Sequence, residues 1–575
     1  MIDQDDLACR VAREESRHQA GIGTCSLALQ IGFFFDGRER NIYVDEDSHR
    51  LTNVGRLFRA HPLELKAPLT SFYSYAKVYI PGLGTLLEDT AAERLDSILD
   101  ARLKALPTDY GESLIEQGKE AVVDTVKGAA HGDWSQVPAN KLEELLSLKS
   151  GFNATVSAVK NAAKRTLLEA AAPIRDNPLV ADLLMSGVDA RVDFAKNKFK
   201  ESIALSKKEN PLPIKLIQIS VFGADLGAVL ARRFIDELLA SVCSKTGNEY
   251  RYQESKVEVI FAGLFDCSRR SPLDMGDAVA EAASWAGLFS KSPAGAPLGV
   301  VAGAKVIEFD QPLHPAVKRA LHLVAAHERR DYRPWLPLGP LRPGWREQLC
   351  PGVSEDVTGG LLPNEQRPSA ELCRVPLRQM FDAARGAQVP FPNFLTLQKT
   401  SRRVASYFVM RDHLAGHSVR DFSHYYRHWI GRFDDPTPAG FARHMQGYCV
   451  WLGEKLHDYL ACLREARGSD RDALKEQWGW LEQVGRDAEN IARSQLSGSK
   501  AAQAIHYAHL VIHFKESMRV PPAIDAFFNY FMHDFGSAEL KHATLDAQAN
   551  TLLRSNNFFL PRGIETVTAA EEVEA

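Results

Sequence analysis

The sequence predicts an α/β domain built on a mostly parallel sheet, enlarged by a helical insertion and followed by an all-helical second domain. Three observations predict this arrangement. Nearly continuous apolar runs enclose a segment with helical spacing, residues 91–208 have almost purely helical periodicity, and strand signals vanish after about Pro392. Continuous apolar runs suit strands that are covered on both faces, as in a parallel sheet.

Composition excludes several classes of protein. The chain has 575 residues, of which 45% are apolar and 25% are charged, and these are proportions of a globular protein. The length alone suggests about three to four domains. Because 69 basic residues are balanced by 73 acidic ones, for a net charge of -4, no basic patch for nucleic acid is indicated.

Cysteine spacing and the chain start predict the cellular compartment. The eight cysteines include no closely spaced pair, so neither a zinc site nor a disulfide scaffold is expected. Met1–Leu7 is acidic and lacks the basic-then-apolar order of a signal peptide. No apolar run reaches the roughly 18 residues of a spanning helix. We expect a cytoplasmic protein without a cofactor, exported only by a route that needs no cleavable signal.

Three segments predict buried strands, and they are Leu27–Phe35, Lys215–Phe222 and Val257–Phe265. Between the last two, Gly227–Leu239 carries apolar residues at helical spacing. A strand, a helix and a strand in this order predict a right-handed crossover unit of a parallel sheet. The domain that contains them is expected to cover residues 24–391.

Residues 91–208 interrupt this domain with helical periodicity, for example at Val188, Val192 and Phe199. We interpret them as a helical insertion. Its apolar face either packs on the sheet domain or docks on a membrane or a partner, and packing is the simpler hypothesis. The small-residue stretch Val279–Phe289 carries the same docking alternative.

The last third of the chain predicts helices. Amphipathic segments such as Phe441–Leu456 indicate a helical domain over 392–560, and the acidic end, 561–575, is expected to be a flexible tail.

Two histidine pairs in this region, His413 with His417 and His424 with His428, have the spacing of one helical turn. Such pairs bind zinc in some proteins. Because no HExxH motif and no third ligand accompany them, no metal site is predicted.

The turn after the second strand, Val221–Gly227, is the most informative element. The nucleophile elbow of α/β-hydrolases has the pattern Gly-x-nucleophile-x-Gly between a strand and a helix. In this turn the two glycines are Gly223 and Gly227, which allow a tight turn and close helix packing. The nucleophile position is Asp225. The third strand ends at Asp266, where the acid that orients a catalytic histidine commonly lies. The sheet is therefore expected to be α/β-hydrolase-like.

Several other segments carry short motifs in a fixed order. They are Phe34–Asn41 (similar to FFDGTGNN), Thr52–Phe58 (TNV-RL), Tyr79–Thr85 (Y-PG-GT), Phe222–Ala228 (FGFSRGA), Gly263–Cys267 (GLFDT), Leu321–Arg330 (a helix after GLFDT), Pro351–Gly360 (PGVHSDVGGG) and Phe527–Asp534 (a segment ending in YVHDS). The ordered set, from about residue 25 to 560, resembles the α/β-hydrolase domain of bacterial type VI secretion lipase effectors of the first family, which are phospholipase A-type enzymes.

The departures from that family concern its catalytic triad. The resemblance places the family's serine at Asp225, its aspartate at Asp266 and its histidine at Ser354, so only the aspartate is kept. Arg38–Arg40 replace small or neutral residues near the place where such folds position an oxyanion donor. Thr358 interrupts the glycine run after the histidine position.

These residues do not support serine catalysis. That chemistry needs a hydroxyl and an imidazole that accepts its proton. Asp225 has no proton to give at neutral pH, and Ser354 is far too weak a base, so the loss of both leaves no serine-esterase mechanism. Asp225 as nucleophile, as in haloalkane dehalogenases and epoxide hydrolases, is an alternative. It needs a histidine to activate water, and His322 or His327, expected on a helix, would have to reach the site.

We therefore expect a catalytically degenerate phospholipase-like protein, a pseudoenzyme that acts by binding. The resemblance implies a type VI secretion context, with a spike protein, an adaptor, or an effector or immunity protein as partner. Contact with a membrane surface and an active secreted phospholipase are the alternatives, and no nucleic acid is expected.

The predicted binding residues lie in the same motifs. If Asp36, Asp225, Asp266 and Asp356 converge, with Gly37 beside them, they form an acidic cleft. Such a cleft would favour a cationic group over a phosphate.

Overall fold

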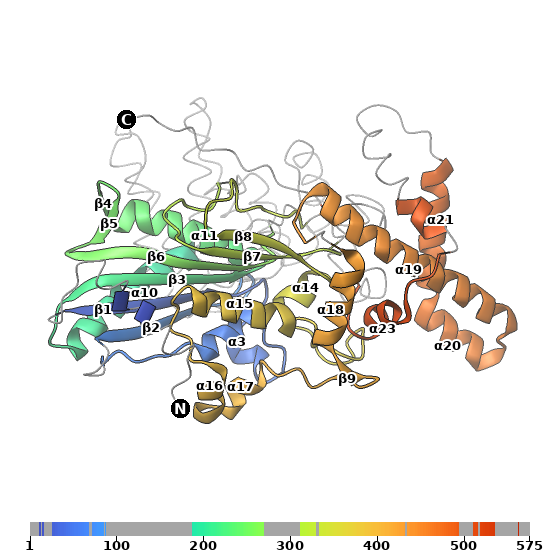
Figure 1. The fold of residues 1–575 in the computed structure, drawn as a ribbon, viewed down its shortest axis with the longest axis horizontal. Coiled ribbons are helices and arrows are strands. Elements are labelled where there is room, and N and C mark those ends of the chain that lie inside the picture. The colour runs from blue at the N-terminus through green and yellow to red at the C-terminus, as the bar shows by residue number, and fades with distance from the viewer. Residues whose placement is uncertain are drawn as a thin grey trace, which may run out of the picture.

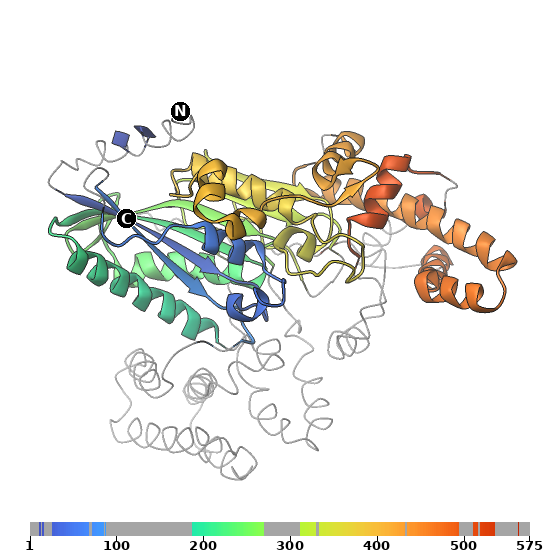
Figure 2. The ribbon, with the colours of Figure 1, turned by 90° about the horizontal axis from the view of Figure 1, so that it is seen from below.

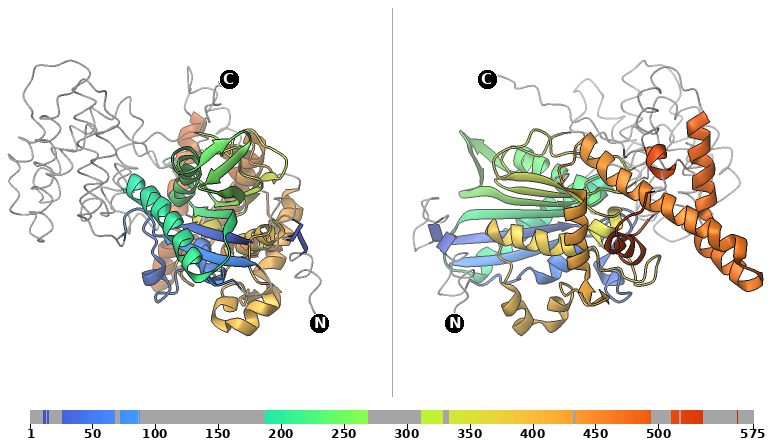
Figure 3. Two further views of the ribbon diagram at one scale, coloured as in Figure 1. Left: turned by 90° about the vertical axis from the view of Figure 1, so that its left-hand side faces the viewer. Right: turned by 45° about the vertical axis from the view of Figure 1, so that its right-hand side comes forward.

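The computed structural model describes residues 11–12, 14–15, 26–67, 72–85, 87, 187–268, 311–328, 333–431, 434–493, 510–515, 518–534 and 562. Within these residues a central sheet with helices on both faces is followed by a helical region (Figure 1). The later part of the helical region, from residue 419 on, lies at one end of the sheet, and its longest helix extends away from it (Figure 3).

In the described parts of the chain, eight strands form one mixed, mostly parallel sheet. They are β1 Leu27–Phe35, β2 Tyr73–Ile80, β3 Ile214–Ala224, β4 Ser244–Thr246, β5 Glu249–Tyr252, β6 Ser255–Phe265, β7 Ala320–Ala325 and β8 Trp345–Cys350. The order is β2-β1-β3-β6-β5-β4, and β7 pairs with both β6 and β8. Among the described strands of this sheet, the pairs β4–β5 and β5–β6 are antiparallel and the others are parallel. The mostly parallel sheet predicted from β1, β3 and β6 is confirmed.

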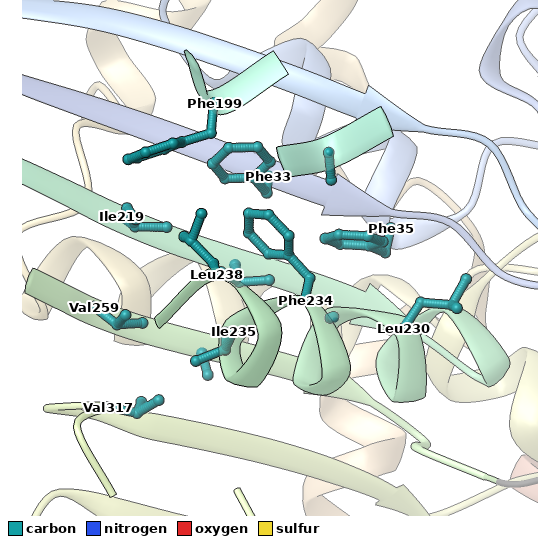
Figure 4. Packing of buried hydrophobic residues seen from close by; sticks show 14 of the residues in the cluster. Phe33, Phe35, Phe199, Ile219, Leu230, Phe234, Ile235, Leu238, Val259 and Val317 are labelled. Carbon is teal, nitrogen blue, oxygen red and sulfur yellow. The ribbon is translucent and has the colours of Figure 1, made fainter. Parts of the chain in front are cut away.

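Alternation along β1 explains how helices cover both faces of this sheet. Phe33 and Phe35 point to one face, where the ring of Phe234 lies 4.5 Å from that of Phe33 (Figure 4). Phe34 points to the opposite face and stacks on Phe222 at 5.0 Å. Every residue of β1 is buried, as a continuous apolar run predicts.

Four main helices form the two outer layers (Figure 2). Helices α10 (Val188–Glu209) and α11 (Leu226–Glu237, continued by the π-helical turn Leu238–Val242) bury their apolar sides with Phe33. Helices α3 (Asn53–Ala60) and α15 (Arg374–Gly386) pack with Phe34, and the short helix α2 is Ile42–Asp45.

Helix α10 is the part of the predicted insertion that the structure describes. Its residues Val188, Val192 and Phe199 are fully buried against the sheet, so the packing hypothesis holds for this helix. Residues 91–186 and Val279–Phe289, for which docking was the alternative, lie outside the described residues.

The region after Pro392 is mainly helical, as predicted. Its helices are α16 Phe394–Thr400, α17 Arg402–Ser406, α18 Val419–Ile430, α19 Pro438–Glu465, α20 Gly468–Trp478, α21 Trp480–Arg493 and α23 Pro522–Tyr530. This region also contains a small hairpin, formed by β9 His413–Leu414 and β10 His417–Ser418, where helical spacing was predicted for the two histidines. Because His413 and His417 lie on this hairpin, they are not one helical turn apart, whereas His424 and His428 both lie on α18.

The helix expected over Leu321–Arg330 is wrong. Ala320–Ala325 is β7, a strand that is buried along its whole length and pairs in parallel with β6 and β8. The run lies between β6 and β8 in the sheet and pairs with both, and periodicity alone does not separate a strand from a helix in so short an apolar segment. The described helices include none that is long and apolar enough to cross a membrane.

Candidate functional site

The turn between β3 and α11 has the strand–turn–helix form that its glycines predict. Asp225 joins the two elements with φ 51° and ψ −124°, a conformation that costs a non-glycine residue of the order of 1–3 kcal/mol. Its N–H donates to the carbonyl of Phe265 at 2.9 Å. A Cβ on Gly227 would lie 2.2 Å from the carbonyl oxygen of Asp36, and one on Gly223 would lie 2.5 Å from Cα of Ala228. Neither position has room for a side chain.

The side chain of Asp225 is buried among polar partners. The hydroxyl of Ser268 donates to Oδ1 at 2.5 Å, and Nη2 of Arg333 lies 3.9 Å from Oδ2. Neither partner was predicted. Ser268 directly follows the GLFDC motif, and this position next to Asp266 is the signal that could have identified it. Arg333 belongs to no motif.

Asp266, at the end of β6, is paired with a residue from the far end of the chain. Its carboxylate receives hydrogen bonds from Nη1 of Arg562 at 2.6 Å and from Nη2 at 3.1 Å, and from the N–H of Ala325 at 2.9 Å. Both side chains are fully buried. Arg562 lies in the segment expected to be a flexible tail, so that expectation fails at this residue, while 563–575 lie outside the described residues.

Ser354 and Asp356 lie on the short helix α14 (Ser354–Thr358) that follows β8. The hydroxyl of Ser354 is buried and has no hydrogen-bond partner within the described structure. Asp356 accepts from the N–H of Val353 at 3.1 Å and from the N–H of His533 at 2.9 Å, and its Oδ1 lies 2.7 Å from Nδ1 of His533. His533 belongs to the last motif of the ordered set, to which sequence reasoning assigned no role.

Asp36 and Gly37 form the turn after β1. Asp36 accepts hydrogen bonds from the hydroxyl of Thr52 at 2.7 Å, the hydroxyl of Tyr79 at 2.6 Å and the N–H of Gly37 at 2.8 Å. Burial raises the pKa of Asp36, and these donors oppose the rise. Three donors occupy this carboxylate, so it organises the turn.

These residues meet at the carboxyl edge of the parallel strands. A Cβ on Gly37 would lie 3.8 Å from Cβ of Asp225, which puts the ends of β1 and β3 side by side. Arg333 connects the elbow to α14, because its Nη1 lies 3.4 Å from Oε1 of Glu355. Thr52, which donates to Asp36, also bridges to Gly359 at the end of α14. This edge is where open α/β sheets bind ligands.

The charge at this edge is not the one that four carboxylates alone would produce. Arg562 neutralises Asp266, and Arg333 lies between Asp225 and Glu355. The prediction of an unusually acidic cleft left these two arginines out, because both are distant from the motifs in sequence.

The two histidines considered as water-activating bases are held elsewhere. Nε2 of His322 accepts from the N–H of Cys267 at 2.9 Å, and its Nδ1 lies 2.9 Å from Oε1 of Glu347. Nδ1 of His327 accepts from the N–H of Gly352 at 2.9 Å, and its Nε2 lies 3.2 Å from the hydroxyl of Tyr426. Both nitrogens of each ring are occupied, so neither imidazole is available to a water.

No metal centre is found among the residues that the structure describes, since they include no group of three or more His, Cys, Asp or Glu side chains placed to hold an ion.

Comparisons with known proteins bear on the fold. No protein-family model matches the chain, and a search of curated proteins gives no match. Among solved structures, an uncharacterized protein from Pseudomonas aeruginosa is similar over 98% of this chain and 82% of that chain, with a TM-score of 0.55 and 16% identity. The Tle1 effector bound to the VgrG spike from the Type 6 secretion system is similar over 59% of this chain and 52% of that chain, with a TM-score of 0.31 and 15% identity. The first likeness shows a shared fold.

Proposed function

We propose that this protein is a catalytically degenerate, α/β-hydrolase-like pseudoenzyme of a bacterial type VI secretion context, which acts by binding a partner protein. The ordered motif set supports the context and the hydrolase-like assignment. The strained conformation of Asp225 supports an elbow that has kept its shape while its side chain changed.

The pairing of Asp266 with Arg562 carries the proposal. In a serine triad the buried acid orients an imidazole, which removes the proton of the nucleophile. Here a guanidinium occupies both carboxylate oxygens of that acid. A guanidinium stays protonated at any physiological pH, so it does not act as a base.

The elbow residue supports the same conclusion. The carboxylate of Asp225 carries a negative charge next to the place where the carbonyl oxygen of an ester would become an oxyanion, so it would repel that oxyanion. It also offers no hydroxyl proton. The hydrogen bond from Ser268 and the nearby Arg333 stabilise that charge. Ser354 supplies no imidazole. The partner expected from the motif resemblance is a type VI spike protein, an adaptor, or an effector or immunity protein.

Phospholipid hydrolysis by the purified full-length protein tests this proposal. We expect vesicles of phosphatidylethanolamine and phosphatidylglycerol to release no more fatty acid with the protein than with buffer, as measured by mass spectrometry. Asp225→Ala should give the same result. Release that is abolished by Asp225→Ala would establish the alternative, an active hydrolase that uses Asp225 as nucleophile.

A further inference from the structure

We propose that the pocket at Asp266 is a guanidinium-binding site, which the chain's own Arg562 fills and which an arginine side chain of the partner protein enters when Arg562 leaves it. The inference deepens the proposed function, on which it rests for a partner protein, by naming the group that the partner presents. It gives the acid of the triad position a role in recognition, in place of the histidine that such an acid orients in a hydrolase.

The pocket offers an acceptor to each nitrogen of a guanidinium. Nη1 of Arg562 donates to Oδ1 of Asp266 at 2.6 Å, and Nη2 donates to Oδ2 at 3.1 Å. Nη1 also donates to the carbonyl of Ala325 at 3.2 Å, and Nε donates to the carbonyl of Arg333 at 3.1 Å. Two bonds to one carboxylate match the planar fork of a guanidinium, whereas an ammonium is a point charge. The acceptors are therefore arranged for a guanidinium.

The walls of this pocket come from the sheet domain. Asp266 follows β6, Ala325 ends β7, and Arg333 lies between β7 and β8. The N–H of Ala325 donates to Oδ1 of Asp266 at 2.9 Å, and the N–H of Leu336 donates to the carbonyl of Cys267 at 3.0 Å. These bonds hold the carboxylate and the neighbouring loop in place without the guanidinium. Residues 266–333 thus supply the acceptors, while the occupant lies 296 positions after Asp266.

The pocket lies at the edge where open parallel sheets bind ligands. Arg333 connects it to the elbow, because its carbonyl accepts from Arg562 while its Nη2 lies 3.9 Å from Oδ2 of Asp225. The side chains of Arg562 and Asp266 are 1% and 0% exposed. A carboxylate so deeply buried is strongly destabilising without a cation. The pocket therefore favours the exchange of one guanidinium for another over an unoccupied state.

A second buried arginine shows how the same side chain looks when it only fastens loops. Arg232 belongs to α11, and its guanidinium donates to the carbonyl oxygens of Gln311, Leu336 and Pro337. In the described part of the chain no carboxylate accepts a hydrogen bond from it. Arg562 differs because it brings its charge to a carboxylate that the sheet presents at its ligand-binding edge.

Removing the chain's own arginine tests whether the pocket binds a guanidinium from solution. We expect methylguanidinium to bind full-length Arg562→Ala at least about tenfold more tightly than the natural chain in isothermal titration calorimetry, because Arg562 competes for the same acceptors. Methylammonium, which carries its charge on one nitrogen, should bind Arg562→Ala about tenfold more weakly than methylguanidinium. The matched control is the double variant Asp266→Asn, Arg562→Ala, which removes the charge of the pocket and should bind neither cation.

A peptide extends the test to an arginine that a protein presents. The peptide acetyl-Gly-Arg-Gly-amide should bind Arg562→Ala within about tenfold of the affinity of methylguanidinium, and its lysine analogue at least about tenfold more weakly. Equal affinity of methylguanidinium for Arg562→Ala and for the natural chain would overturn the inference. Binding that survives in the double variant would also overturn it, as would binding of methylguanidinium without binding of the arginine peptide.

If Arg562→Ala does not fold in buffer, its folding is followed by circular dichroism with methylguanidinium or methylammonium present. A ligand that binds only the folded state stabilises it, so methylguanidinium alone should restore folding, and no restoration would overturn the inference. Arg562→Lys, which keeps a cation beside Asp266, is the second variant. It should bind methylguanidinium more tightly than the natural chain does, and equal binding would again overturn the inference. The phospholipid assay is independent of these outcomes, because a chain that neither hydrolyses lipid nor binds a guanidinium contradicts this inference alone.

Discussion

Single carboxylates at one sheet edge are held here by three kinds of partner. Neutral hydroxyls and an amide hold Asp36, a guanidinium holds Asp266, and an imidazole with two amides holds Asp356. Each partner stabilises the side chain but brings a different charge, because hydroxyls and amides are neutral whereas a guanidinium is always a cation. The identity of the partner, rather than the presence of an aspartate, therefore determines what each position can do.

Asp236 of α11 is one carboxylate whose titration should affect stability near neutral pH. Burial raises its pKa from 3.8 to about 7, although Arg232 opposes the rise. Because the folded pKa exceeds the unfolded one, the folded chain keeps a proton that the unfolded chain has lost between these values. Stability therefore falls as pH rises from about 4 to about 7. Asp236→Asn does not ionise, so we expect it to be more stable than the natural chain at pH 8, by on the order of 1 kcal/mol, and similar at pH 4.

Urea unfolding at pH 4, 6 and 8 would measure this difference. A gain from Asp236→Asn that is the same at all three values would contradict the titration and point to packing alone.

At the scale of elements, the elbow depends on how closely α11 approaches β1. A Cβ on Gly227 would lie 2.2 Å from the carbonyl oxygen of Asp36 and 2.6 Å from that of Phe35, and both are backbone atoms of the neighbouring strand and its turn. Backbone atoms cannot move away by changing rotamer as a side chain can. Gly227→Ala should therefore destabilise the fold by about 1–3 kcal/mol or more. Thermal unfolding followed by circular dichroism would measure it.

Gly386, the last residue of α15, provides the matched control. A Cβ there would meet nothing within 4 Å, so Gly386→Ala should be neutral or stabilising by about 0.5–1 kcal/mol. Similar losses at Gly227 and Gly386 would show that the close approach of α11 to β1 is not what the glycine serves.

At the scale of the whole molecule, buried polar contacts connect distant parts of the chain. The N–H of Gly352 donates to Nδ1 of His327, whose Nε2 faces the hydroxyl of Tyr426, and that hydroxyl lies 2.8 Å from Nδ1 of His444. Because the amide donates, Nε2 of His327 carries the proton in the neutral ring. This relay joins the loop after β7 to α18 and α19, so the helical region is fastened to the sheet at its carboxyl edge.

The pair of Asp266 and Arg562 spans 296 positions of the sequence and should be the most costly of these contacts to break. Arg562→Gln would leave a buried carboxylate without its cation, and we expect a loss of about 3–5 kcal/mol in urea unfolding. The double variant Asp266→Asn, Arg562→Gln should lose less unfolding free energy than either single variant, because it buries no unpaired charge. Additive losses would contradict a coupled ion pair.

The sequence by itself determined β1, β3, β6, α11 and the turn between β3 and α11. These elements are marked by local signals, which are continuous apolar runs, helical spacing and glycines at sites without room for a Cβ. Such signals determine the local conformation of the backbone. It did not determine β7, since a short apolar run suits a strand or a helix until its neighbours are known.

Only the tertiary structure decided what surrounds the candidate site. The positions of Asp225, Asp266 and Ser354 were readable from motifs, but Arg333, Arg562 and His533 were not assigned to them. The physical reason is that an ion pair or a hydrogen bond depends on a distance of a few ångströms between groups more than a hundred residues apart in the sequence. The packing of the whole chain sets that distance, and no local pattern records it.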